Sequence, residues 1–502
     1  MNSTRRDFLK WTAAGAAAAA LPSLLQGATG AGPRPNFVII QNDSMDGRVI
    51  HCAGHPAAYT PNIDALAARG ALFHNTYCSS PLCVPSRASM FSGLHTHQCE
   101  AWNNSKGIGK GTPTFLTELG KAGYTLSVHG KTDYGSGAHG FMGNVAGWTR
   151  TADIRLVYGQ YGVEVRVKWQ DADFYDKEWD LARTAADSVK KNAAAGKPFL
   201  VYAGFGIPHV YYRGMTKWLE KIDPAKVALP PKEIEHHAAM DLVRLQKGAD
   251  GPYPDDWILK LRRTYYSMIA EFDAMLAEIV AAVEAAGVAD NTYIIFVSDH
   301  GDMQMEHSMI AKCVMYEGAV RVPLVIAGPA VKKGTVVERP TSLVDVFPTI
   351  MDMADLQGPK NLSGCSLMAD LTGRPSNHPD YVLSQYHGNF AVTGFFMLRR
   401  GDWKYIAYPG YEPQLFNLKD DPDEIHNLVA RQSDVVKEMD AKLREAVDYP
   451  AVDAKVKEYD KRSFREWRAS VNEKTYRGAM GFVYTGFGDK EEQEIQAWLA
   501  RA

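Results

Sequence analysis

The chain has 502 residues, 46% of them apolar and 23% charged, which is enough to build one large hydrophobic core and a smaller one. Its 55 basic and 58 acidic side chains give a net charge of −3. The chain therefore lacks the overall positive field of nucleic-acid-binding proteins, which argues against a nucleic acid as partner. Any site for an anion must be local.

The first 32 residues have the features of an export signal. Arg5 and Arg6 precede an uncharged, alanine-rich run from Trp11 to Leu25, and small residues follow. This order is typical of a twin-arginine signal peptide. A membrane anchor is the alternative, but the run is shorter than the ~20 residues that span a bilayer. We therefore expect residues 1–32 to direct the chain through the twin-arginine translocase and to be removed. The mature protein would be periplasmic or extracellular and not integral to a membrane.

Six cysteines lie at irregular spacings along the chain, which is too sparse for a disulfide scaffold. Cys78 and Cys83 have no matching second pair, so a zinc site is not expected. The spacing leaves one disulfide open and does not say which cysteines would form it.

The first element expected after the signal is a buried strand. Residues 35–40 form a short apolar run rich in β-formers, and a polar loop with Asp43 follows at once. Residues 60–70 then have the features of a helix, with Thr60 as its cap, Pro61 in the first turn and Gly70 at its end.

The same order of strand, polar loop and helix recurs downstream. Apolar runs at residues 199–205 and 293–299 each end in polar residues, and residues 259–283 carry apolar side chains at helical spacing. Alternating strands and helices predict an α/β fold with a largely parallel sheet. In such sheets, ligands bind beyond the carboxyl ends of the strands.

The pattern changes near residues 373–378, which resemble a linker. An antiparallel pair of strands is expected within residues 395–408, followed by charged helices to the end of the chain. We therefore expect a large N-terminal domain at residues 33–373 and a smaller α+β subdomain, with a small antiparallel sheet and helices, at residues 374–502.

The segment CVPSRASMFSG, residues 83–93, places a cysteine at the start of a helix. Pro85 is tolerated in a first helical turn, so Cys83 lies where free N–H groups favour an anion and lower a thiol pKa. The alternative interpretation of the same pattern is a buried cysteine with a structural role only.

This segment resembles the C-x-P-S-R signature of the type I sulfatases, whose cysteine is oxidised to formylglycine (3-oxoalanine). Other segments resemble motifs of the same family, and they are found at residues 35–44, 123–135, 206–209, 297–329 and 415–428. The resemblance implies an alkaline-phosphatase-like sandwich around a central, mostly parallel sheet, with residues 33–373 as the catalytic domain. It also implies hydrolysis of sulfate monoesters.

The resemblance further implies a metal site rich in hard oxygen ligands, which suits Ca²⁺ better than zinc. The ligands that it implies are Asp43, Ser44, Asp299, His300 and the oxygen of the modified Cys83. Asn42 is an alternative to Ser44.

The same resemblance assigns roles in catalysis and substrate binding. The catalytic residues that it implies are Cys83 as nucleophile precursor, Arg87 to fix the formylglycine hydrate, Lys131 and Lys312 to hold sulfate oxygens, and His209 to protonate the leaving sugar oxygen. The substrate-binding residues are Lys131, His209 and Lys312, with His97 and His387 as weaker candidates for the sugar pocket.

Several shorter motifs point to one branch of the family, the glucuronate 2-sulfatases, which act at chain ends of glycosaminoglycans. They are found at residues 42–48, 82–97, 100–107, 130–139, 147–150, 386–388 and 402–408. A sulfated saccharide is then the substrate, and a formylglycine-generating enzyme is a partner. Two alternatives stay open: a phosphonate or phosphate ester hydrolase of the same superfamily, and a non-catalytic protein that binds sulfated glycans.

Overall fold

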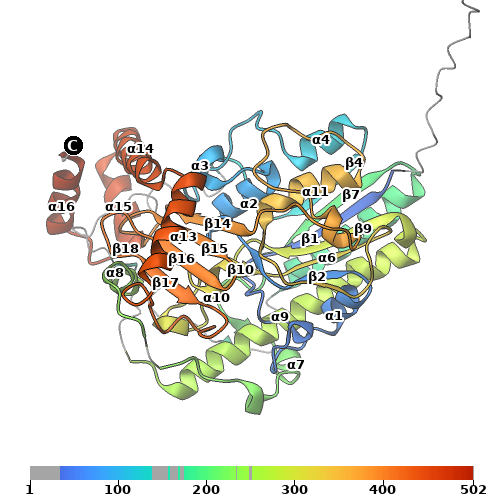
Figure 1. Ribbon diagram of the computed structural model, residues 1–502, viewed down its shortest axis with the longest axis horizontal. Helices are drawn as coiled ribbons and strands as arrows, with labels where there is room; N and C mark the ends of the chain where they lie inside the picture. The colour runs from blue at the N-terminus through green and yellow to red at the C-terminus, as the bar shows by residue number, and fades with distance from the viewer. Residues whose placement is uncertain are drawn as a thin grey trace, which may run out of the picture.

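The computed structural model describes residues 34–137, 157–158, 168–169, 175–232, 234–247 and 252–500. The predicted signal at residues 1–32 and the motif at residues 147–150 lie outside the described residues. A seven-stranded sheet forms the centre of the molecule (Figure 1), in the order β12-β2-β11-β9-β1-β7-β4. Its strands are β1 (Asn36–Asn42), β2 (Ala71–Phe73), β4 (Thr125–Gly130), β7 (Phe199–Gly204), β9 (Thr292–Ser298), β11 (Leu324–Ala327) and β12 (Thr335–Val337).

Four neighbouring strands of this sheet run in the same direction. β1 pairs in parallel with both β9 and β7, and β4 pairs in parallel with β7. β11 is antiparallel to β9 and to β2. The prediction of a mostly parallel sheet is therefore confirmed, and the carboxyl ends of β9, β1, β7 and β4 meet at one edge.

Alternating side chains of the sheet supply a hydrophobic core on each face. In β1, Phe37 and Ile39 belong to one core, and Val38 and Ile40 belong to the other. Helices cover both faces (Figure 1). Those on the Val38 side are α1 (Pro61–Ala68), α6 (Asp176–Ala194) and α9 (Asp255–Ala285), and those on the Phe37 side are α2 (Cys83–Ser92), α4 (Phe115–Lys121) and α11 (Val346–Met353).

The helix predicted at residues 60–70 forms as α1, but Thr60 does not cap it. The Thr60 hydroxyl donates to Asp64 instead, at 3.1 Å. The Asp273 carboxylate on α9 accepts hydrogen bonds from the N–H groups of Asn62 and Ile63, at 3.1 and 2.8 Å. A carboxylate from another helix therefore satisfies these first-turn donors, which a local sequence pattern does not reveal.

A separate antiparallel sheet follows in the C-terminal part of the chain, as predicted. Its strands are β14 (Tyr381–Tyr386), β15 (Phe395–Arg400), β16 (Trp403–Ala407) and β17 (Gln414–Asn417). The later helices are α13 (Ser433–Ala446), α14 (Tyr449–Ser470), α15 (Glu473–Val483) and α16 (Asp489–Ala500). One face of this sheet packs on α13, and the other joins the core that contains Phe37. The boundary at residue 373 stays a proposal.

Short elements complete the described chain. They are β3 (Thr76–Tyr77), β5 (Val157–Tyr158), β6 (Lys168–Trp169), β8 (Arg213–Gly214), β10 (Arg321–Val322), β13 (Thr341–Ser342), β18 (Tyr484–Thr485), α3 (Thr96–Cys99), α7 (Thr216–Leu219), α8 (Ala238–Gln246), α10 (Glu317–Val320) and α12 (Met368–Leu371). Within the described residues, we find no helix with the length and apolarity that a membrane span requires.

Candidate active site

The four parallel strands deliver polar side chains to one edge of the sheet. Asp43 follows β1, Lys131 follows β4, and Asp299 follows β9, each directly after the strand ends. His209 comes from the loop after β7. These residues are far apart in sequence, and the parallel arrangement places them together, as expected for this class of fold.

Cys83 faces this edge from the first turn of α2. Leu82 before it is extended, and the N–H of Val84 donates to Asn104 Oδ1 at 3.1 Å, which fixes the start of the helix. The Cys83 Sγ lies 3.3 Å from His300 Nε2 and 3.4 Å from Lys312 Nζ. The side chain is buried, with 1% of its surface exposed. The predicted position at a helix N-terminus is confirmed.

Three further potential metal ligands converge around this thiol. Ligand atoms of Asp43, Cys83, Asp299 and His300 all lie within 4.8 Å of one another, and all four residues are buried. The Ser44 hydroxyl is 3.0 Å from Asp43 Oδ1, so it lies beside the same cluster. In a converted enzyme, a formylglycine oxygen would stand in place of the Cys83 sulfur.

The donor set fits a hard divalent cation. Two buried carboxylates and a hydroxyl are oxygen donors, as Ca²⁺ prefers, and His300 adds one imidazole nitrogen. The Asn42 Oδ1 is buried and has no hydrogen-bond partner within the described part of the chain. It is therefore a further oxygen that could serve the same ion.

Arg87 and Lys131 hold the two carboxylates in place. The Arg87 guanidinium donates to Asp299 Oδ2 at 2.7 Å and to Asp43 Oδ2 at 3.4 Å. It also donates to the Lys131 carbonyl at 2.8 Å and to the Tyr202 hydroxyl at 3.1 Å. The Lys131 ammonium lies 2.5 Å from Asp43 Oδ2. Arg87 is fully buried, and its predicted role in fixing the formylglycine hydrate stays a prediction.

Lys312, which contacts the Cys83 thiol, also contacts His209. The Lys312 ammonium is 2.6 Å from His209 Nε2, and His209 Nδ1 is 2.7 Å from the Val210 carbonyl. A carbonyl only accepts and an ammonium only donates. His209 therefore carries its proton on Nδ1, and its Nε2 lone pair faces Lys312.

Cys83 differs from the other five cysteines in its electrostatic surroundings. Burial and the Asp43 carboxylate act to raise the pKa of the Cys83 thiol, but Lys131, Lys312 and His300 outweigh them and hold it well below its usual value. Burial raises the pKa of each of the other thiols. The surroundings of Cys83 therefore favour a negative charge at this position.

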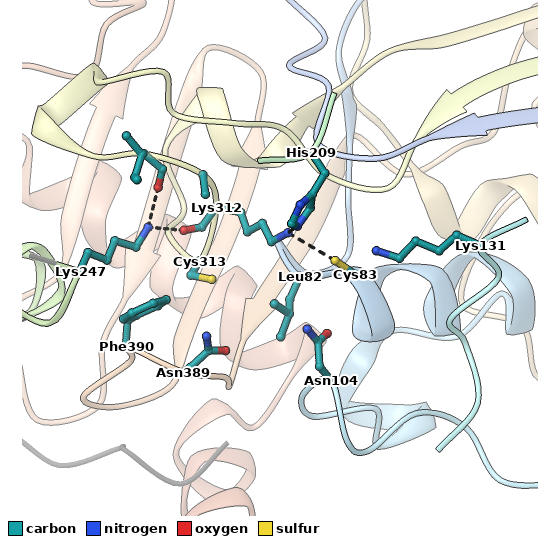
Figure 2. A pocket seen from close by; sticks show the side chains of 12 residues that line it. Leu82, Cys83, Asn104, Lys131, His209, Lys247, Lys312, Cys313, Asn389 and Phe390 are labelled. Carbon is teal, nitrogen blue, oxygen red and sulfur yellow. Dashed lines mark hydrogen bonds between the residues drawn. The ribbon is translucent and has the colours of Figure 1, made fainter. Parts of the chain in front are cut away.

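A cavity of about 220 Å³ opens beside Cys83 (Figure 2). Its lining combines the predicted site residues with several that the sequence analysis missed. The predicted ones are Cys83, Lys131, His209 and Lys312, and the missed ones include Asn104, Lys247, Asn389 and Phe390. Asn104 belongs to a motif quoted above, so it could have been found. Lys247 follows an ordinary amphipathic helix, α8, and no sequence motif marked it as a residue of the site.

A second cavity of about 280 Å³ adjoins the first, since Lys131 and His209 line both. Arg213 and Glu178 also line this second cavity. The Glu178 carboxylate accepts from the Gly206 N–H at 3.2 Å.

Two predicted sugar contacts do not line either cavity. His387 is buried against the rings of Trp102 and Phe396, at centroid distances of 5.4 and 5.1 Å. His97 pairs with Gln385 at 2.7 Å, and burial lowers its pKa to about 4. Their roles in substrate binding stay predictions.

Comparison with known proteins agrees with this geometry. The family profile described as Sulfatase matches residues 35–356, and one described as N-sulphoglucosamine sulphohydrolase, C-terminal, matches residues 305–449. Arylsulfatase K of Danio rerio is 37% identical over 467 residues, covering 88% of this chain and 89% of that protein. The chain belongs to the sulfatase family. Human arylsulfatase K is 35% identical over 468 residues, covering 88% of this sulfatase and 87% of its own length. The activity is therefore that of a sulfuric ester hydrolase. The predicted substrate, a 2-sulfated glucuronate, stays a proposal.

Solved structures of low sequence identity share the fold. A phosphonate monoester hydrolase of Agrobacterium radiobacter superposes with a TM-score of 0.69 at 23% identity, covering 84% of this sulfatase and 96% of that chain. A structure described as a 2-O GAG sulfatase gives a TM-score of 0.65 at 22% identity, covering 88% and 94%. The predicted fold class is confirmed.

The comparison also bears on export. A profile of the twin-arginine translocation signal matches residues 2–22 of this sulfatase. The predicted export signal is confirmed.

Proposed function

We propose that this sulfatase removes the 2-O-sulfate from a terminal glucuronate of glycosaminoglycan-type oligosaccharides, with a formylglycine made from Cys83 and a bound Ca²⁺. The observation that carries this proposal is the position of Cys83, beside the potential metal ligands Asp43, Asp299 and His300 and in one cavity with Lys131 and Lys312. The sugar is proposed from the branch motifs and from the similarity to arylsulfatase K.

The residues around Cys83 have separate tasks in this reaction. Formylglycine would add water to give a hydrate, of which one geminal hydroxyl would serve as nucleophile toward sulfur; loss of the proton from the second hydroxyl would re-form the aldehyde and release sulfate. Asp43, Asp299 and His300, with Ser44 beside them, would hold the cation. Lys131 and Lys312 lie where they can bind sulfate oxygens, whose negative charge matches two ammonium groups in a buried site.

His209 is proposed as the group that protonates the departing sugar oxygen. In the substrate-free enzyme its Nε2 is occupied by the Lys312 ammonium. A sulfate ester that engages Lys312 would leave Nε2 able to take up a proton. That proton then has a short path to the sugar oxygen, because His209 lines the same cavity as Cys83.

The cavity favours action at a chain end. Its volume of about 220 Å³ is below the ~300–1,000 Å³ of pockets for drug-sized ligands, so it suits one sugar residue. A cavity of this size can take the terminal residue of a polymer, which supports exo-action.

Burial of Cys83 also bears on when its conversion occurs relative to folding and export. A side chain that is 1% exposed is not accessible to a modifying enzyme in the folded protein. We therefore infer that the formylglycine-generating enzyme converts Cys83 before the chain folds. Because the twin-arginine pathway carries folded proteins, conversion precedes export to the periplasm or beyond.

Sulfate release from defined substrates tests the proposed function. The mature enzyme is given an oligosaccharide with a 2-O-sulfated glucuronate at its non-reducing end, a matched one with this residue internal, and phenyl phosphonate monoester. We expect sulfate from the first substrate only. Release from the internal residue would contradict exo-action. Turnover of the phosphonate ester alone would favour the alternative hydrolase.

Replacing His209 with glutamine should slow hydrolysis of the sugar substrate more than hydrolysis of an aryl sulfate. We expect kcat to fall by roughly 10²–10⁴-fold on the 2-sulfated glucuronide and by less than about tenfold on 4-nitrophenyl sulfate, whose leaving oxygen needs no proton. Steady-state kinetics on both substrates measure the difference. His236→Gln, at an exposed histidine, is the matched control. Equal losses on both substrates would mean that His209 only binds.

A further inference from the structure

The catalytic cavity holds another buried cation, which the proposed mechanism does not use. Lys247 directly follows α8, lines the cavity and is 3% exposed. Its ammonium donates to the carbonyls of Ile310, at 3.0 Å, and Lys312. The Phe390 ring lies beside it, with the ring centroid 5.5 Å from Nζ.

Lys247 has no anionic partner in the part of the chain that the structure describes. Two of its three N–H groups are used by the two carbonyls, and none of the described carboxylates forms an ion pair with it. Burial lowers the pKa of Lys247; Cys313 and Asp302 act to raise it, and the nearby Lys312 acts to lower it. A buried ammonium without a counter-charge is unfavourable. An anion bound in the cavity would supply the missing charge.

The position of Lys247 relative to Cys83 suits a substrate with two anionic groups. One lysine connects the two ends of the cavity: the Lys312 carbonyl contacts Lys247 Nζ, and the Lys312 Nζ is 3.4 Å from Cys83 Sγ. Figure 2 shows Lys247 and Phe390 at one end, and Cys83 and Lys131 at the other. In a pyranuronate, C2 and C5 are opposite ring atoms, so a 2-sulfate and the 5-carboxylate point to opposite sides.

We propose that Lys247 binds the substrate carboxylate and thereby selects uronates over neutral sugars. This inference rests on the proposed function, and it adds the residue that determines the sugar class. With sulfate at Cys83, the carboxylate extends toward Lys247, where a charge-assisted hydrogen bond forms in a buried site. Phe390 beside Lys247 and the neighbouring Asn389 line the part of the cavity that the sugar would enter.

Arg213 in the adjoining cavity is the competing cation for this carboxylate. Lys247 is favoured because it shares its cavity with Cys83, whereas Cys83 does not line the Arg213 cavity. Lys247 is also buried, while Arg213 is only half-buried.

Two sulfate esters that differ only in the carboxylate test the proposal. The mature, converted enzyme is assayed on a 2-O-sulfated methyl glucuronide and on the 2-O-sulfated methyl glucoside, in which a hydroxymethyl group replaces the carboxylate. We expect the wild type to prefer the glucuronide in kcat/KM by roughly 10–100-fold. Lys247→Met is expected to lose this preference. Its kcat/KM for the glucuronide should fall by that factor, and its kcat/KM for the glucoside should change by less than about threefold.

Further variants separate substrate binding from a structural role. If Lys247→Met does not fold, Lys247→Gln is measured in the same way, and its thermal unfolding is compared with that of the wild type. Equal losses on both esters would overturn the proposal, since Lys247 would then only position the segment of Ile310 to Lys312. Loss of the preference in Arg213→Met, with Lys247→Met unchanged, would place the carboxylate in the second cavity. A wild type that hydrolyses both esters equally overturns this inference alone. A wild type that releases no sulfate from either ester contradicts the proposed function.

Discussion

Replacing Cys83 with alanine is expected to lower sulfate release by roughly 10⁴-fold or more, as loss of a catalytic nucleophile does in other hydrolases. The physical reason is that position 83 is the point at which the metal ligands and the cations Lys131 and Lys312 converge. In wild-type protein from the native host, mass spectrometry of the peptide containing Cys83 should show sulfur exchanged for oxygen with the loss of two hydrogens.

Cys52→Ala is the matched control, because Cys52 is an exposed thiol. It should retain activity, and both variants should unfold at temperatures close to that of the wild type. An unmodified thiol in correctly exported, active protein would contradict the formylglycine proposal. An unmodified thiol with no activity but with retained binding of sulfated glycans would favour the non-catalytic alternative.

Removal of divalent cations with a chelator is expected to abolish sulfate release, and Ca²⁺ is expected to restore it better than Zn²⁺. The reason is the donor set, in which Asp43 and Asp299 supply hard carboxylate oxygens. Because an ion that binds only the folded state stabilises it, Ca²⁺ at 100 times its Kd should add about 2.7 kcal/mol of stability. Activity and thermal unfolding after chelation, followed by titration of each metal, measure both effects.

A variant at the metal site separates ion binding from a general salt effect. Asp299→Asn should lower activity by at least about 100-fold and weaken the stabilisation by Ca²⁺. This change also removes a buried partner of Arg87, at a cost of about 3–5 kcal/mol, so circular dichroism must show that the variant is folded. Asp352→Asn, at an exposed position of α11, should behave as the wild type. Full activity after exhaustive chelation would contradict the metal proposal.

The sequence by itself determined the elements that carry the site. Short apolar runs that end in polar residues predicted β1, β7 and β9, and these strands form at nearly the predicted bounds. Pro85 in a first helical turn predicted that Cys83 lies at or just before the start of a helix, and α2 begins at Cys83. Strand and helix signals of this kind lie within a few consecutive residues, which is why they are readable without the fold. The motifs added Asp43, Lys131, Asp299 and His300, which the structure places in one site.

Only the tertiary structure decided which distant side chains complete that site. Asp273 satisfies the first-turn N–H groups of α1 across 210 positions. Tyr202 supports Arg87 from the interior of a strand, and Lys247 reaches the cavity from the segment after α8. The packing of His387 against the rings of Trp102 and Phe396 likewise joins distant segments, and its predicted place in the sugar pocket stays a prediction. Such contacts depend on how helices pack on the sheet, and packing joins segments whose local patterns carry no information about each other.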